Sequence, residues 1–281
     1  MDWLNAIDLL QLVYLCLLLL ASGLAAGFLA GLFGVGGGII LVPVLDQLFV
    51  LFGVDSEVSI DMAVATSLAS IIFSSIASAR AHRRQGNIDW ALIRRWAFWV
   101  VVGAVLGYGL VKLLNGDLVR LAFACVAILV AGWLILAPSR LVLSTEPPFG
   151  WVGRGWASLV GMLSALLGIG GGVLAVPLLT LYAYPSQRAT GTSAAIGFFI
   201  AAPATATAII LGLRSEVERP FLSLGEVNLI ALVILIPMTM ISAPWGAALG
   251  QRLSSLTLRR IFGLFMLLVA TRMILAASGA I

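Results

Sequence analysis

Two glycine-rich breaks interrupt apolar runs that are otherwise long enough to cross a lipid bilayer. The first break, 34–38, reads Gly-Val-Gly-Gly-Gly, and the second, 168–172, reads Gly-Ile-Gly-Gly-Gly. Each glycine costs about 1 kcal/mol relative to alanine inside a helix, so four in five positions end it. In hydrocarbon the freed backbone groups need partners, so such breaks persist only where protein or a water-filled cavity covers them. Two matching breaks therefore predict a binding site at the centre of a transporter.

Composition places the whole chain in a membrane. Of its 281 residues, 62% are hydrophobic and 10% are charged, and no polar stretch is long enough for a soluble domain. Because one crossing needs about 20 apolar residues, the apolar runs predict an all-α, multi-pass membrane protein. The first run, 9–33, is expected to be retained, because no Lys or Arg precedes it as in a cleaved signal peptide. The net charge of +4 includes no basic block on a foldable surface, so no nucleic-acid partner is expected.

The second half of the chain repeats the first. Residues 1–137 and 151–281 are predicted to be two repeats joined by a proline-containing linker, 138–150. Each repeat is expected to hold a glycine-broken helix hairpin followed by three transmembrane helices. Identical residues recur 139 positions apart, a strong repeat signal, in the pairs Gly86/Gly225, Gly107/Gly246, Arg120/Arg259 and Phe123/Phe262. The expected helices are 9–33, 39–52, 60–81, 86–114, 118–136, 151–167, 173–182, 189–213, 225–249 and 254–277, with 53–59 a polar loop.

Loop charges predict that the two halves are inverted relative to each other in the membrane. The loop from Arg80 to Arg95 holds five arginines and one aspartate, net +4, whereas its counterpart, Arg214 to Glu226, holds two arginines and three glutamates, net −1. The next loops reverse the bias: 112–120 carries +1 and its counterpart +3. Since basic loops face the cytoplasm, both termini are predicted to be periplasmic and the linker cytoplasmic. Inverted repeats permit alternating access to a central site.

The helices after the breaks direct their first N–H groups into the break. These groups carry about half a positive charge, which makes a seat for an anion without Lys or Arg. Hydroxyls in the next helices can donate to an oxyanion, although such hydroxyls often bond within their own helix instead. The predicted substrate-binding residues are Gly36, Gly37, Gly38, Thr66, Ser67, Gly170, Gly171, Gly172, Thr192 and Ser193. The residues predicted to support the breaks are Gly34, Pro43, Gly168 and Pro177.

The glycines leave two questions open. Glycine in membrane helices often serves only close packing, which is the role expected for Gly103, Gly107 and Gly109. The helices after the breaks could cross the membrane fully or return midway as re-entrant hairpins.

Two charged residues in apolar surroundings are further candidates, because charge within a membrane marks function by default. Asp46 is a candidate for carrying coupling protons and Arg188 for attracting an anion, although both could lie near the interface. His82, which stands among arginines, is expected to be a loop residue. The chain has no HExxH, GxSxG or phosphate-cradling motif, so no catalytic residue, metal or cofactor is expected and the protein is not predicted to be an enzyme.

These motifs resemble those of the TauE/SafE family of bacterial membrane proteins, the sulfite exporter and sulfonate-uptake-permease group. The likeness runs through the first break with Pro43, then Ala-Thr-Ser at 65–67 and Gly-Asn-Ile-Asp-Trp at 86–90, and their counterparts in the second half. The resemblance implies a secondary transporter in the inner membrane that exports a small anion, such as sulfite or sulfoacetate, coupled to protons. A passive anion channel and a transporter of small carboxylates are the alternatives. The expected partners are the bilayer and a small anionic substrate, and a homodimer is one arrangement left open.

Overall fold

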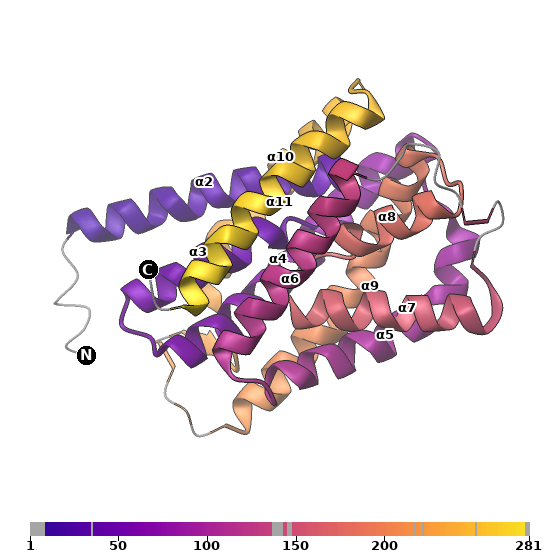
Figure 1. Cartoon of the computed structure of the whole chain (residues 1–281). Coiled ribbons are helices and arrows are strands. Elements are labelled where there is room, and N and C mark those ends of the chain that lie inside the picture. The colour runs from indigo at the N-terminus through magenta and orange to yellow at the C-terminus, as the bar shows by residue number, and fades with distance from the viewer. Residues whose placement is uncertain are drawn as a thin grey trace.

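The computed structural model describes residues 9–34, 36–136, 143–144, 148–215, 217, 219–220, 222–250 and 252–278. Helices make up nearly all of this part of the chain (Figure 1). Those of the first half are α2 (Leu9–Phe33), α3 (Gly38–Leu51), α4 (Ser56–Arg84), α5 (Trp90–Val111) and α6 (Gly116–Leu136). Those of the second half are α7 (Gly150–Leu166), α8 (Gly172–Leu181), α9 (Ser186–Leu213), α10 (Leu229–Gly250) and α11 (Ser255–Ala277). A two-stranded hairpin, β1 (Ser223–Leu224) and β2 (Val227–Asn228), precedes α10.

Seven of the described helices are long and apolar enough to cross a membrane, which confirms the predicted all-α, multi-pass fold. They are α2 from Cys16 onward, α4, α5, α6, α9, α10 and α11 from Arg260 onward. The helix expected to span over 151–167 is α7, whose 17 residues cover about 26 Å and leave it outside this set. The surface agrees with a lipid environment, because large hydrophobic side chains such as Leu129 on α6, Val233 on α10 and Leu268 on α11 are exposed.

The two helices that follow the glycine breaks do not cross the membrane. At 1.5 Å per residue, the 14 residues of α3 and the 10 residues of α8 reach about 21 and 15 Å, short of a hydrocarbon core of about 30 Å. The Leu143 N–H, in the segment that leads to α7, donates to the Leu181 carbonyl at the end of α8 at 2.7 Å. The α7–α8 hairpin therefore enters and leaves by the same side and is re-entrant.

Two expected boundaries were wrong for local reasons. The segment 53–59 was predicted to be a loop, but α4 begins at Ser56, because the Asp55 carboxylate accepts the Glu57 N–H at 2.9 Å and caps the helix. A helix was predicted from residue 225, but 223–228 forms the β1–β2 hairpin, with Gly225 at a φ of +58° in its turn.

Reciprocal packing joins the two halves. The first helix of each half lies along the fourth helix of the other, α2 with α10 and α7 with α5, while α4 packs on α9 and α6 on α11. Glycines make these approaches close: a Cβ on Gly31 would collide with the Ala243 carbonyl, and one on Gly107 with the Met162 carbonyl. The packing role expected for Gly103 and Gly107 is thus confirmed, whereas a Cβ on Gly109 would meet nothing within 4 Å.

The two longest helices run in opposite directions through the middle of the bundle. α4 has 29 residues and α9 has 28, and they pack on each other. The Asp89 N–H, just after the end of α4, donates to the Thr192 hydroxyl near the start of α9 at 3.0 Å. The end of α4 therefore lies beside the start of α9. The two hairpins consequently approach the centre from opposite ends, since α3 leads into α4 and α8 leads into α9.

Candidate functional site

The two glycine turns meet at the centre of the molecule. A Cβ added to Gly36 would lie 2.9 Å from the Gly170 Cα, and one added to Gly38 would collide with the Gly168 carbonyl oxygen. Gly36 has a φ of +79° and Gly168 a φ of +64°, conformations that side chains disfavour. Both the contact and the turn geometry therefore require glycine at these positions.

This contact closes the gap in which the sequence placed an anion. If a single methyl group cannot fit between Gly36 and Gly170, a solute cannot lie directly between the turns in this conformation. The expectation that the anion binds directly between the two glycine turns is therefore corrected for this conformation. Room for a ligand has to lie beside the turns, or has to open when they separate.

The turns lie level with the middle of α4. The Ser67 hydroxyl donates to the Gly168 carbonyl at 2.8 Å, and the Ser74 hydroxyl donates to the Gly36 carbonyl at 3.0 Å. Both serines are buried and lie near the midpoint of this 29-residue helix. One membrane-spanning helix therefore holds both turns near mid-membrane, through carbonyls that the broken helices leave free.

The two helix ends at the turns are buried and have no side-chain cap. Neither α3 nor α8 has a side-chain hydrogen bond at its N-cap, whereas Asp55, Asp89 and Ser254 cap α4, α5 and α11. The first N–H groups of a helix have no acceptor within the helix, so these ends keep the partial positive charge of the dipole. They are suited to stabilise an anion that approaches them.

Three of the four predicted hydroxyls bind backbone groups of other segments. Thr66 accepts the Asn228 N–H and Thr192 accepts the Asp89 N–H, both at 3.0 Å, so each half holds the turn before the fourth helix of the other. Ser67 is bonded to Gly168. Ser193 differs, because its buried hydroxyl has no partner within the described part of the chain. Five other buried hydroxyls, those of Ser70, Ser75, Ser164, Thr205 and Ser223, likewise have no partner among the described residues, so this observation does not by itself mark Ser193 as a ligand site.

A cavity of about 50 Å³ lies beside the start of α8, room for a few water molecules. Gly172 and Pro177, both predicted from the sequence, line it. Sequence reasoning missed its other polar residues, since single hydroxyls in apolar helices form no motif; they are Thr180, Ser186 and Thr190. Its aromatic walls are Phe33, Trp133 and Phe262. No hydrogen bond joins the Thr190 hydroxyl to a described residue, although Thr190 is only 6% exposed.

The corresponding place beside α3 is filled by an ion pair. Asp46 stands 134 positions before Thr180, the separation of the two breaks. Its carboxylate accepts from Arg120 at 2.7 and 2.9 Å and from the Ser59 hydroxyl at 2.6 Å. Arg120 is 2% exposed, so both charges are buried and each compensates the other. Asp46 is therefore a fixed partner of Arg120 in this conformation.

An arginine of α11 also fills the region beside α3 that corresponds to the cavity beside α8. Arg272 stands 139 positions after Trp133, the separation seen in the last helices of the repeats. Its guanidinium donates to the Pro43 carbonyl at 2.7 Å and to the Gln47 side chain. Where the second half has an indole beside a cavity, the first half has a cation bound to α3.

Arg188 lies at the start of α9 and is half exposed. It forms an ion pair with Asp89 at 3.0 Å, and the Tyr184 hydroxyl donates to the same carboxylate oxygen at 3.0 Å. Burial alone would raise the pKa of Asp89, but bonds from the Leu92 N–H and Tyr184 and the charge of Arg188 lower it below its ordinary value. Burial and the bond to Asp89 raise the pKa of Tyr184 to about 12.

His82 is not the loop residue that the sequence suggested. It lies in the last turn of α4 and is 4% exposed, with Nε2 3.1 Å from the Gly31 carbonyl. One turn earlier on α4, the Ser78 hydroxyl donates to the Ala30 carbonyl at 3.3 Å. His82 and Ser78 therefore both contact backbone carbonyls near the C-terminal end of α2.

Comparison with known proteins gives the family. The sequence model of the sulfite exporter TauE/SafE family matches residues 19–273. The chain belongs to the TauE/SafE family. It is 32% identical over 265 residues to a "Probable membrane transporter protein" of Haemophilus influenzae, covering 94% of this chain and 98% of that one.

Other relatives of this TauE/SafE protein carry the same description. A "Probable membrane transporter protein" of Methanocaldococcus jannaschii is 31% identical, covering 89% of this chain and 95% of the relative. YunE of Bacillus subtilis is 27% identical, covering 92% and 96%. No solved structure matches. The family, these relatives and the seven apolar helices make the chain a multi-pass membrane transporter.

Proposed function

We propose that this TauE/SafE protein is a secondary transporter that exports a small anion, sulfite or an organosulfonate such as sulfoacetate, across the inner membrane by alternating access. The observation that carries the proposal is the meeting of two buried, uncapped helix ends near the middle of α4. In the low dielectric of the membrane, such ends attract an anion without any Lys or Arg.

Reciprocal contacts support two inverted repeats as the moving framework. The packing of α2 on α10 and of α7 on α5, and the paired bonds from Asn228 to Thr66 and from Asp89 to Thr192, are what two halves related by a two-fold axis would form. The arginine-rich end of α4 then faces the cytoplasm, and both chain termini face the periplasm.

The contrast between the two ends of α6 supports access from the cytoplasmic side in this conformation, which an exporter needs for loading. The cavity lies at the end of α6, which the loop charges place toward the cytoplasm, while the Asp46–Arg120 ion pair seals the opposite end. The cytoplasmic side therefore has a small cavity beside the start of α8, which has to widen to load an anion. Release to the periplasm requires the glycine turns to part and the ion-paired side to open.

Transport of sulfite by purified protein in proteoliposomes tests the proposal. Gly171→Leu should lower the flux at least tenfold, because a side chain there would press on Ile200 and Ile196 and hold the turn in one position. Gly109→Leu is the matched control, since open space surrounds that glycine. Equal flux in the wild type and both variants would contradict the proposal. Flux that neither saturates nor responds to a pH gradient would instead identify a passive channel.

A further inference from the structure

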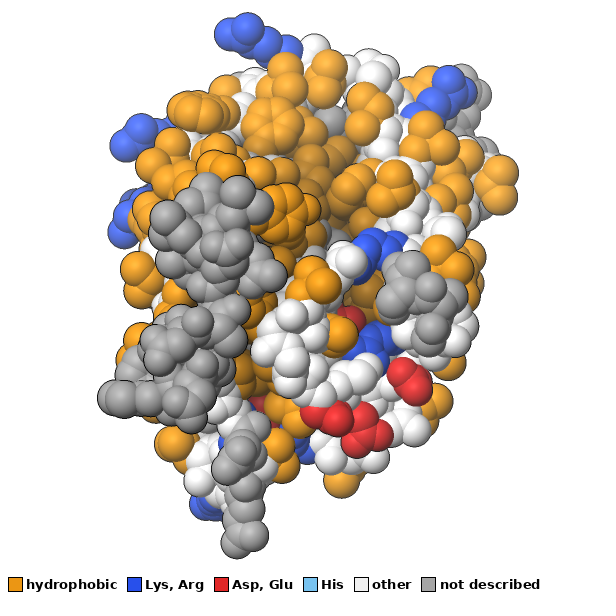
Figure 2. Space-filling view, turned by 90° about the vertical axis from the view of Figure 1, so that its left-hand side faces the viewer, with side chains coloured by type: hydrophobic (Ala, Val, Ile, Leu, Met, Phe, Trp, Pro, Cys, Tyr) orange, Lys and Arg blue, Asp and Glu red, His pale blue; other side chains and the backbone are white. Residues whose placement is uncertain are grey.

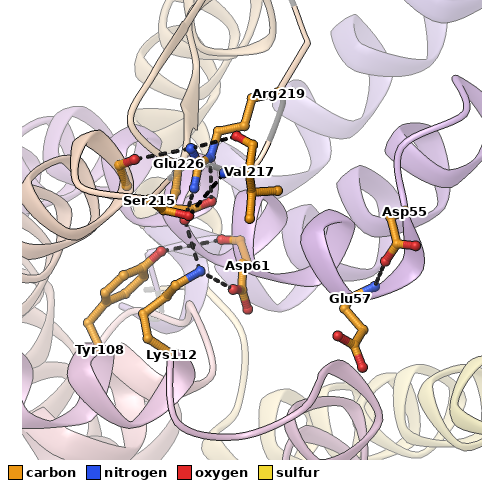
Figure 3. Close-up of polar contacts among 10 residues, drawn as sticks. Asp55, Glu57, Asp61, Tyr108, Lys112, Ser215, Val217, Arg219 and Glu226 are labelled. Carbon is orange, nitrogen blue, oxygen red and sulfur yellow. Dashed lines mark hydrogen bonds and ion pairs between the residues drawn. The ribbon is translucent and has the colours of Figure 1, made fainter.

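A network of four charged side chains lies at the end of the molecule where α4 begins (Figure 3). Lys112, which follows α5, places its ammonium 2.6 Å from the Asp61 carboxylate of α4 and 2.9 Å from the Glu226 carboxylate in the β1–β2 turn. Arg219 donates to both oxygens of Glu226, at 2.8 and 3.2 Å. The network joins the first half to the second, and none of its members took part in the site described above.

The two carboxylates are held unequally. Glu226 is fully buried and has two cationic partners, whereas the Asp61 carboxylate has Lys112 alone. Tyr108 of α5 makes only a long contact of 3.5 Å to the backbone carbonyl of Asp61. The charges on α3 and α6, which also pack near the start of α4, are paired with each other as Asp46 and Arg120.

Lys112 keeps its charge in this setting. Burial would lower the pKa of its ammonium, but the Asp61 and Glu226 carboxylates raise it above the ordinary value. A proton that enters the network therefore goes to a carboxylate. The Asp61 carboxylate is the one with a single partner, and 12% of its side chain is exposed to receive that proton.

Asp61 lies on the helix that holds both glycine turns. Six residues further along α4, Ser67 is bonded to the Gly168 carbonyl, and Ser74 beyond it is bonded to the Gly36 carbonyl. Thr66 on the same helix holds the Asn228 N–H at the end of the hairpin that carries Glu226. Asp61 and the serines that hold both turns therefore belong to one continuous helix.

We propose that Asp61 is the proton-binding site that couples transport to the proton gradient, and that its protonation releases the start of α4 from Lys112 and Glu226. This inference rests on the proposed anion transport. When Asp61 is protonated, its attraction to Lys112 is lost and the network passes from neutral to a net charge of +1, which favours separation of the halves at this end. The matching position in the second half is Gln187, 126 residues later, which cannot take up a proton, so the coupling is one-sided.

The experiment measures sulfite flux in proteoliposomes twice, as counterflow without a pH gradient and as net flux with one. Wild-type protein should show counterflow, and a pH gradient should raise its net flux severalfold. Asp61→Asn should keep counterflow within about twofold of wild type while its response to the gradient disappears. Glu57→Gln is the matched control, because Glu57 is an exposed carboxylate one turn earlier on α4 and should leave both measurements unchanged.

A second variant, Lys112→Gln, tests the proposal even if Asp61→Asn does not fold. Lys112→Gln removes the partner of Asp61, so the pH of half-maximal driven flux should rise by about 1 unit or more. A full response to the gradient in Asp61→Asn, loss of its counterflow in folded protein, or an unchanged midpoint in Lys112→Gln would each overturn the proton site. Absence of counterflow in the wild type would instead contradict the transport function itself, and the proton site would fall with it.

Discussion

Gly36 and Gly170, 134 positions apart in the sequence, touch through their backbones at the centre of the molecule. Each ends a broken helix that approaches from the opposite side, and each is followed by an uncapped helix start. The contact brings two positive helix ends together in a membrane interior, which is unfavourable unless an anion compensates them or the turns move apart. We therefore expect this contact to change when the two halves move relative to each other.

Replacing Gly36 should destabilise the closed contact. Gly36→Ala places a Cβ 2.9 Å from Gly170 and 3.0 Å from Ile71, at a φ of +79° that costs a non-glycine residue about 1–2 kcal/mol. We expect a lower midpoint of thermal unfolding in detergent. Gly109→Ala, in open space, should be nearly neutral, and equal midpoints for the two variants would contradict the role of the contact.

Two equivalent serines should respond differently to loss of their hydroxyls. Ser67→Ala leaves the buried Gly168 carbonyl without its donor, which should cost about 1–3 kcal/mol of unfolding free energy. Ser193→Ala removes a hydroxyl that has no described partner, so stability should hold. If the Ser193 hydroxyl donates a hydrogen bond to the anion, Ser193→Ala should raise the KM for sulfite severalfold while the free energy of unfolding stays unchanged. A loss of stability in Ser193→Ala with an unchanged KM would mean that the anion does not bind at Ser193.

Loss of the Thr190 hydroxyl should weaken substrate capture from the cavity side. Thr190→Val keeps the shape of the side chain and matches Val64, the residue at the equivalent position of the first half. We expect a higher KM with little change in the maximal rate. Thr207→Val is a suitable control, since Thr207 bonds only to the Pro203 carbonyl of its own helix. Identical kinetics in both variants would show that the cavity beside α8 takes no part in substrate capture.

Breaking the buried Asp46–Arg120 pair from one side should be costly. Arg120→Met leaves Asp46 with Ser59 as its remaining side-chain donor and should cost about 3–5 kcal/mol. The double variant Asp46→Leu/Arg120→Met should lose much less than the sum of the single changes, as measured by a double-mutant cycle of unfolding midpoints. Additive losses would mean that the pair is not coupled as its geometry indicates.

The Asp89 network should make a small contribution to stability that depends on pH. Because the pKa of Asp89 is lowered on folding, its stabilisation is present above its ordinary value of 3.8 and is lost as the pH falls through the lowered value. Asp89→Asn keeps a helix-capping side chain but no charge. The difference from wild type should be no more than about 1 kcal/mol at pH 7, since Arg188 is half exposed, and should vanish in acid. A difference that grows in acid would contradict this sign.

The end of the molecule where α4 begins carries both charged and hydrophobic side chains. Figure 2 views the left-hand end of Figure 1 and shows acidic side chains gathered in its lower part beside some basic ones, with further basic side chains at the upper and left edges and hydrophobic side chains over much of the remaining surface. This is the end where α4 begins and where the Asp61 network lies partly accessible.

The sequence by itself determined the two breaks, the family motifs and the crossing helices other than α7, because hydrocarbon imposes a minimum length and a break in a helix needs glycine. It placed the ends of α3 and α8 within one residue but left open whether these helices cross or return, and the contact of Leu143 with Leu181, which is tertiary, decided this for α8. Only the tertiary structure decided that Gly36 meets Gly170, that Thr66 and Thr192 hold the opposite half, and that Asp61 faces Glu226. These contacts join residues more than 100 positions apart, and they depend on how helices pack, which no periodicity in the chain encodes.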